Sequence, residues 1–193
     1  ASDVYVDPNI SQECSEEGCG TDQNPFKTIT WALQMILPSF ENIVTLHLAS
    51  GTYSPETGEE FPIILPDYVI LEGTNEESTI IDAMQTDRVF IIQGAFDITF
   101  SELTIQGGFT ETNNDGYNPG GGLYINGSEV LFYNVTISSN NAIGSQAAQG
   151  GGLFSIWSNI TFFNVTITTN TASAGGGLYL ILCTATLDNV NII

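Results

Sequence analysis

The sequence predicts an all-β protein, a parallel β-helix solenoid with a short helix at its N-terminal end. Two motifs recur in fixed phase along the chain. Gly-Gly-Gly-Leu-aromatic begins at Gly120, Gly150 and Gly175, and Asn-Val-Thr/Asn-Ile begins at Asn134, Asn164 and Asn189. Both motifs advance by 30 and then by 25 residues (120 to 150 to 175, and 134 to 164 to 189). Two unrelated motifs in one phase indicate a repeated structural unit.

The second motif lies in segments that alternate apolar and polar side chains. Residues 160–162 and 165–167 show this alternation, which is typical of a strand with one buried face. It recurs in residues 130–137, more weakly in 185–192, and without the glycines in 98–105. We therefore expect one inward stack, made of Leu103, Val135, Val165 and Val190. Units of roughly 25 residues without helical crossovers predict coils of about three short strands.

The glycine triplets are the predicted tight corners of the coils, because glycine tolerates positive φ and lets neighbouring backbone approach closely. The alternative interpretation is a phosphate-binding loop. Such a loop requires a following helix and usually a lysine, and neither follows these triplets. The predicted corner residues are Gly120, Gly121, Gly122, Gly150, Gly151, Gly152, Gly175, Gly176 and Gly177.

Residues 25–37 are the predicted N-terminal cap, because an open coil exposes core and unpaired backbone. Pro25 suits a first helical turn, and Asn24 is the candidate N-cap. Apolar side chains at helical spacing form its predicted buried face: Phe26, Ile29, Leu33 and Ile36. The alternative is a partner-binding helix. We expect one domain, with residues 1–43 as entry loop and cap helix and residues 44–193 as coils.

Two groups of motifs resemble known families. Ile137-Ser138-Ser139-Asn140 before the triplet at Gly150, and Ile167-Thr168-Thr169-Asn170 before the triplet at Gly175, are similar to the repeat of chlamydial-type polymorphic outer membrane proteins. That family favours Phe where this chain has Ile. Val4-Tyr5-Val6-Asp7-Pro8 and residues 20–29 resemble the entry segment of pectin-lyase-like proteins, as do residues 44–48, 51–53 and 69–73. Both resemblances imply a right-handed parallel β-helix, but neither specifies an activity.

The charge balance limits the partners. The chain has 22 acidic and 2 basic residues, a net charge of −20. Such a surface repels nucleic acid and anionic membranes, and it attracts divalent cations or cationic partners. Ca²⁺ is the one candidate cofactor that this negative charge suggests, and the sequence identifies no residues that would bind it. The sequence contains no apolar run of about 20 residues that would span a membrane. We expect a secreted or cell-surface chain, because it begins at Ala1 without a signal-like segment.

The cysteines favour the same location. Cys14 and Cys19 lie in one Gly/Glu/Ser-rich loop, where a disulfide is favoured. A zinc site is the alternative, but the neighbouring Glu13, Glu16 and Glu17 are hard ligands. Cys183 is expected to be a buried thiol.

Five Asn-x-Ser/Thr sequons are candidate glycosylation sites, at Asn9, Asn126, Asn134, Asn159 and Asn164. Asn134 and Asn164 also share a position in the repeat with Asn189. There asparagine can adopt a left-handed conformation and hydrogen-bond to its counterparts in neighbouring coils. We favour such a ladder for these three residues, and Asn126 and Asn159 as the better glycan acceptors.

No catalytic residues are predicted. The candidate base His47 is interpreted as an outer-face strand residue near the cap, Lys27 as part of the cap helix and Arg88 as a turn residue. None of them lies in the repeated coils, where the catalytic groove of related lyases is expected. After residue 100 the only aspartates are Asp115 and Asp188, far apart in sequence. General acid–base catalysis needs paired groups, and no such pair is visible.

The function predicted is therefore a non-catalytic extracellular structural or adhesive module, such as a subunit of a surface filament or of a larger adhesin. Its partners would be other protein subunits or carbohydrate at the cell surface. Head-to-tail association is expected through the apolar strand that ends at Ile193, whose backbone edge would be unpaired. The alternative is a β-helix protein that binds or degrades polysaccharide. The outer faces are expected to expose Thr and aromatic side chains, namely Thr136, Thr166, Thr168, Tyr124, Tyr179 and Trp157.

Overall fold

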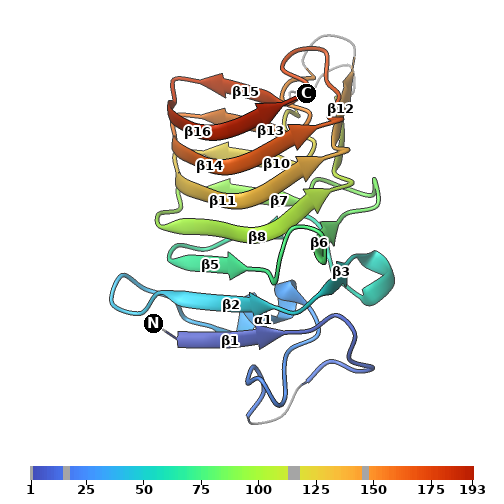
Figure 1. Cartoon of the computed structure of the whole chain (residues 1–193), viewed down its shortest axis with the longest axis vertical. Helices are drawn as coiled ribbons and strands as arrows, with labels where there is room; N and C mark the ends of the chain where they lie inside the picture. The colour runs from blue at the N-terminus through green and yellow to red at the C-terminus, as the bar shows by residue number, and fades with distance from the viewer. Residues whose placement is uncertain (1, 15–17, 113–117, 145–147) are drawn as a thin grey trace.

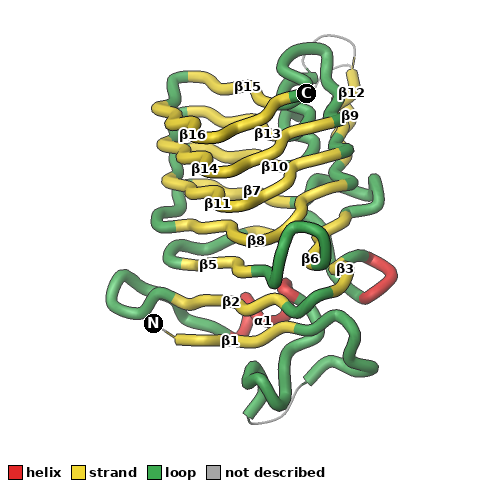
Figure 2. The backbone as a smooth tube through the Cα atoms, in the orientation of Figure 1, coloured by secondary structure: helices red, strands yellow, loops and turns green. Residues whose placement is uncertain are grey.

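The structure is a computed structural model that describes residues 2–14, 18–112, 118–144 and 148–193, and it is a right-handed parallel β-helix (Figures 1 and 2). The largest sheet has the order β1 (Ser2–Val6), β2 (Val44–Leu48), β5 (Val69–Glu72), β8 (Ile98–Gln106), β11 (Glu129–Ser138), β14 (Asn159–Thr168) and β16 (Thr184–Ile192), with β3 (Gly51–Tyr53) and β6 (Thr79–Asp82) at its side. The second sheet runs β4 (Ile63–Ile64), β7 (Phe90–Gln93), β10 (Leu123–Asn126), β13 (Leu153–Ile156) and β15 (Leu178–Ile181). The third pairs β9 (Phe109–Thr112) with β12 (Asn141–Gly144).

The coils differ in one respect from the predicted three separate strands. In β8, β11, β14 and β16 two strand segments run together, bent at one residue with positive φ. The bending residues are Glu102, Asn134, Asn164 and Asn189, with φ of 56°, 50°, 52° and 52°. Because one left-handed residue turns the chain without a loop, the hydrogen-bond ladder continues on both sides of the bend.

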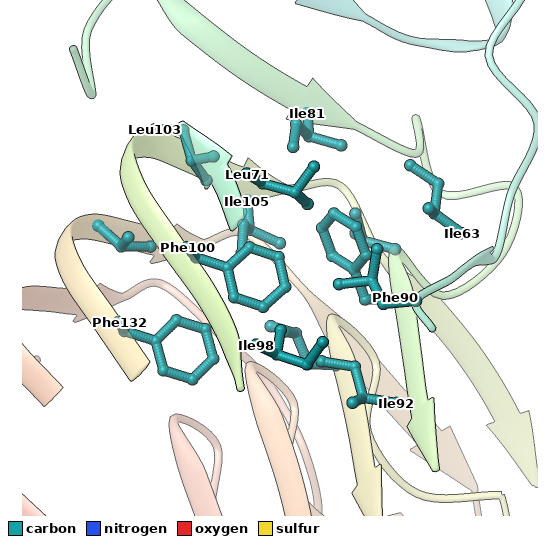
Figure 3. Packing of buried hydrophobic residues seen from close by; sticks show 14 of the residues in the cluster. Ile63, Leu71, Ile81, Phe90, Ile92, Ile98, Phe100, Leu103, Ile105 and Phe132 are labelled. Atoms are coloured by element: carbon teal, nitrogen blue, oxygen red, sulfur yellow. The ribbon is translucent and has the colours of Figure 1, made fainter. Parts of the chain in front are cut away.

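The interior consists of side-chain stacks that run along the solenoid axis. The predicted inward stack is confirmed, because Leu103, Val135, Val165 and Val190 pair in register from strand to strand. A second stack joins Phe100, Phe132 and Phe162, whose parallel rings lie 5.1 Å apart at each step. Figure 3 labels the first two of these rings. Burying each ring stabilises the fold by about 1.5–3 kcal/mol.

The N-terminal helix is shorter than predicted. Helix α1 spans Ile29–Met35 and lies at the N-terminal end of the stack, near β1 (Figure 1). Its N-cap is Thr28, whose side chain accepts a hydrogen bond from the Trp31 backbone N–H at 3.2 Å. The predicted start at residue 25 with Asn24 as cap is wrong, because Phe26 lies in an extended segment bridged to Val6. Among the described residues, no helix is long and apolar enough to cross a membrane.

The glycine triplets form corners at which neighbouring coils come into close contact. The first glycine of each, Gly120, Gly150 and Gly175, has a φ of 78°, 64° and 60°. The later glycines are needed for space, since a Cβ on Gly122 would lie 2.4 Å from the Gly152 carbonyl oxygen. It would also meet the fully buried Asn140 amide at 2.8 Å. This contact explains in physical terms why Asn and the glycine triplet recur together.

Candidate functional site

Four polar or aromatic side chains from the first three rungs of the large sheet meet on its outer face. Tyr5 of β1 pairs with His47 of β2, which pairs with Glu72 of β5. Asp3 lies two residues before Tyr5 and therefore faces the same side. Val4 and Leu46, in alternate positions, pack toward the interior. The position of His47 on an outer strand face agrees with the prediction.

His47 is held by a carboxylate at each ring nitrogen. Nε2 lies 2.9 Å from Asp3 Oδ1, and Nδ1 lies 2.8 Å from Glu72 Oε2. The Tyr5 ring stacks on the imidazole at a centroid distance of 4.9 Å. In the imidazolium form both nitrogens donate, so both contacts are satisfied together. No motif in the sequence links these residues, which the register of three strands brings together from distant positions.

A cavity of about 270 Å³ opens beside this cluster. Tyr5, His47 and Glu72 line it from the sheet, and Asp7, Asp22 and Thr74 line it from the adjoining segments. An aromatic wall with a few convergent polar groups is typical of a site for a small polar ligand. Its carboxylates disfavour anionic ligands.

Arg88 belongs to a second cluster. It lies in the segment between β6 and β7, outside the repeated motifs as predicted, but its side chain reaches the first glycine triplet. Its guanidinium donates to the Gly120 and Pro119 carbonyl oxygens, each at 2.7 Å, and lies 5.4 Å from the centroid of the Tyr124 ring. Burial lowers the pKa of Arg88, opposed by the negative charge of Asp87. These contacts anchor the backbone that leads into the first glycine triplet, which is a structural role.

The aromatic side chains expected on exposed faces are mostly covered. Tyr124, Phe154 and Tyr179 form a parallel stack along the second sheet, with centroid distances of 5.7 and 5.9 Å. Phe154 is buried and the two tyrosines are half-buried, so they were wrongly predicted to be exposed. The predicted threonines are half-buried as well: Thr136, Thr166 and Thr168. Trp157 is exposed as predicted.

The remaining charged candidates are scattered. Lys27 lies just before α1, where its backbone N–H donates to Glu13 at 2.7 Å. Asp188 is exposed on β16, and Asp115 lies outside the described residues. Within the described ranges, no group of three His, Cys, Asp or Glu side chains could hold a metal ion.

The predicted disulfide is present between Cys14 and Cys19, with their Cα atoms 5.7 Å apart. The Trp31 indole N–H donates to the Cys14 carbonyl oxygen at 3.2 Å, which fixes this loop on α1. Of the alternative ligands, Glu13 hydrogen-bonds to backbone instead, and Glu16 and Glu17 lie outside the described residues. Cys183 is half-buried rather than buried, with its sulfur 3.4 Å from Ser155 Oγ.

The sequons divide into two groups. Asn164 donates to Asn134 Oδ1 at 3.0 Å, Asn189 donates to Asn164, and Asn134 donates to Glu102. The predicted ladder is thus confirmed, and Glu102 was missed as its first member because it is not an asparagine. Asn159 is exposed and Asn126 half-exposed, whereas the Asn9 amide donates to Asp7 and to the Ser50 carbonyl oxygen. Glycosylation itself stays a prediction for all five.

Known proteins share this fold. Pectin methylesterase PemA from Erwinia chrysanthemi aligns with a TM-score of 0.52 and 15% identity, over 90% of this chain and 57% of that chain. A pectin methylesterase crystal structure in complex with a hexasaccharide gives the same values. Metabotropic glutamate receptor-like protein P of Dictyostelium discoideum is 32% identical over 130 residues, which cover 66% of this chain and 9% of that protein.

This chain thus spans less than two thirds of each of these proteins, and at 15% identity the structural likeness shows the fold alone. A family model gives a more direct assignment. The model described as "Protein of unknown function (DUF1565)" matches residues 14–183, most of the 193-residue chain. The chain therefore belongs to the DUF1565 family.

Proposed function

We propose that this protein is a secreted, non-catalytic module that binds neutral polysaccharide and acts in adhesion, with the Tyr5–His47 cavity as its primary sugar site. The observation that carries the proposal is the stacked ring pair at a cavity edged by carboxylates and a threonine. Sugars present apolar C–H faces and hydroxyl edges, so they need both kinds of group. The fold shared with pectin methylesterases, one of them solved with a hexasaccharide, is consistent with this ligand class.

The arrangement of His47 favours binding over catalysis. A histidine base needs one ring nitrogen free to take a proton from the substrate or from water. Both nitrogens of His47 are already within hydrogen-bonding distance of carboxylates, those of Asp3 and Glu72. The imidazole is therefore suited to hold its position against Tyr5, where it forms part of the cavity wall.

The negative charge of the molecule favours neutral polysaccharides over anionic ones. A net charge of −20 repels polyuronates such as demethylated pectin over distances of about 10 Å at 0.1 M salt. Neutral chains carry no such penalty. Secretion fits the Cys14–Cys19 disulfide, since such bonds persist in oxidising compartments.

Binding is tested by calorimetry and affinity electrophoresis against hydroxyethylcellulose, xyloglucan, galactomannan and polygalacturonate. We expect binding to at least one neutral chain and none to polygalacturonate. Tyr5→Ala should weaken binding about tenfold or more, because losing a ring contact costs about 1.5–3 kcal/mol. Phe96→Ala is the matched control, an exposed ring that does not line the cavity, and it should bind normally.

Two outcomes contradict the proposal. One is the absence of binding to every neutral chain by protein whose circular dichroism shows it to be folded. The other is the release of reducing or unsaturated ends during incubation with the same panel, lost on replacing His47 with Ala, which would make the module an enzyme.

A further inference from the structure

We infer that the bound ligand is an extended polysaccharide chain that runs along the solenoid axis, from the Tyr5–His47 cavity to an apolar ridge formed by Leu131, Tyr133 and Phe163. This inference rests on the proposed function and adds the length and direction of the ligand. It places a second contact surface on strands β11 and β14, far from the cavity in sequence.

Strand register connects the two surfaces. One outward column contains Tyr5, His47, Glu72, Ser101, Tyr133 and Phe163, each paired with the next. The adjacent column, two residues earlier on each strand, contains Asp3, Thr45, Ile70, Thr99, Leu131 and Thr161. Both ends of the stripe therefore face the same side of the same sheet, whose strands lie one above another in Figure 1.

The ridge places three large apolar side chains next to one another on an outer strand face. Leu131, Tyr133 and Phe163 are 36%, 41% and 36% exposed, whereas the inward-facing Val130, Phe132 and Phe162 are buried. The Tyr133 and Phe163 rings are parallel within 1°, with centroids 5.2 Å apart, so they form one continuous apolar edge. Adjoining large apolar side chains on a surface indicate a contact site.

The surroundings of the ridge indicate which ligand covers it. Glu129, Asn159 and Thr161 border the ridge, and all three are exposed. Polar groups beside an apolar edge suit a sugar chain, which offers C–H groups and hydroxyls together. The carboxylate and the overall charge again favour a neutral chain.

The distance between the two surfaces sets the ligand length. From β2 to β14 the path crosses four strand spacings, through β5, β8 and β11. At about 4.8 Å per spacing this is roughly 19 Å, longer than a disaccharide and within the reach of a hexasaccharide. Ser101 is buried at the midpoint, so the ligand would pass over the half-buried Ile70 and Thr99 beside it.

The test compares the dimer and the hexamer of cello-, xylo- and manno-oligosaccharides by calorimetry. For the backbone that binds, we expect the hexamer to bind about tenfold tighter than the dimer. Phe163→Ala and Tyr133→Ala should lower hexamer affinity toward that of the dimer and leave dimer affinity unchanged. Tyr133→Phe, which keeps the ring, is the control and should behave as wild type. Tyr5→Ala should weaken both ligands.

The outcomes separate this inference from the proposed function. Equal affinity for dimer and hexamer, or normal hexamer binding by both ridge variants, overturns the inference while leaving the cavity as a sugar site. Loss of hexamer binding in the ridge variants with no effect of Tyr5→Ala instead overturns the role of the cavity. Absence of binding to all oligosaccharides overturns both.

Discussion

Single residues with left-handed backbone conformation determine where the chain turns. The coil bends at Glu102, Asn134 and Asn164 place an amide or carboxylate at the same point of successive rungs. Asparagine adopts this conformation more readily than other side chains, and its amide can donate to one neighbour and accept from another. One residue type therefore provides both the turn and a cross-link between coils.

Two glycines at coil corners are required for different reasons. Gly122 is required for space, and Gly127 is required for its backbone conformation. A Cβ on Gly122 would lie 2.4 Å from a backbone oxygen, whereas Gly127 has a φ of 61° and open space around it. Gly127→Ala should cost about 1–2 kcal/mol from backbone conformation alone. Gly122→Ala should cost more, about 3 kcal/mol, because the stacked corner must move. Urea unfolding of both variants measures this, and a smaller loss for Gly122→Ala would refute the steric explanation.

At the scale of the element, helix α1 depends on acidic side chains contributed by other segments. Glu59 is buried and accepts hydrogen bonds from the Ile29 and Thr30 backbone N–H groups at 2.7 and 2.9 Å. Glu13 accepts from the Lys27 and Thr28 N–H groups at 2.7 and 3.2 Å. The first turn of a helix leaves such groups without partners, so the helix start is fixed by tertiary contacts.

Glu59 should make stability fall as the pH rises. Burial raises the pKa of Glu59, and the hydrogen bonds from Thr30 and Ile29 only partly offset this. A raised pKa in the folded state means that the proton stabilises the fold, fully so below the unfolded pKa of 4.5. The contribution is then lost as the pH rises through the folded pKa. Wild type should therefore lose stability relative to Glu59→Gln as the pH rises from 4.5 toward neutral, as measured by urea unfolding. An unchanged difference across that range would contradict this.

The helix also shows why its boundaries were predicted poorly. Apolar spacing identified the buried Ile29 and the partly buried Leu33, but it placed the start at Pro25. The true start depends on Glu59 and Glu13, which no local pattern connects to the helix. Likewise, the stack through Val135 and Val165 was predictable because its spacing repeats, whereas Asp3, His47 and Glu72 lie in rungs that share no motif.

At the scale of the whole molecule, the net charge of −20 opposes the compact state. Salt screens this repulsion, with a Debye length of about 30 Å at 0.01 M and about 10 Å at 0.1 M. We expect the melting temperature to rise by several degrees between these concentrations of NaCl. CaCl₂ at equal ionic strength is the comparison. A much larger rise with CaCl₂ would indicate specific Ca²⁺ binding, and no rise with either salt would contradict the role assigned to repulsion.

In the three rungs that carry a glycine triplet, the number of residues between the triplet and the following strand is constant. This limits where the length of such a rung can change. From Leu123 to Val135, from Leu153 to Val165 and from Leu178 to Val190 there are 12 residues each time (135 − 123, 165 − 153, 190 − 178). The segment from Ile137 to Gly150 spans 13 positions, but that from Ile167 to Gly175 spans only 8 (150 − 137, 175 − 167). Among the three rungs that carry a glycine triplet, the difference in length is thus confined to one edge of the rung. A rung can be duplicated, or its edge loop replaced, without disturbing the register of the outward columns.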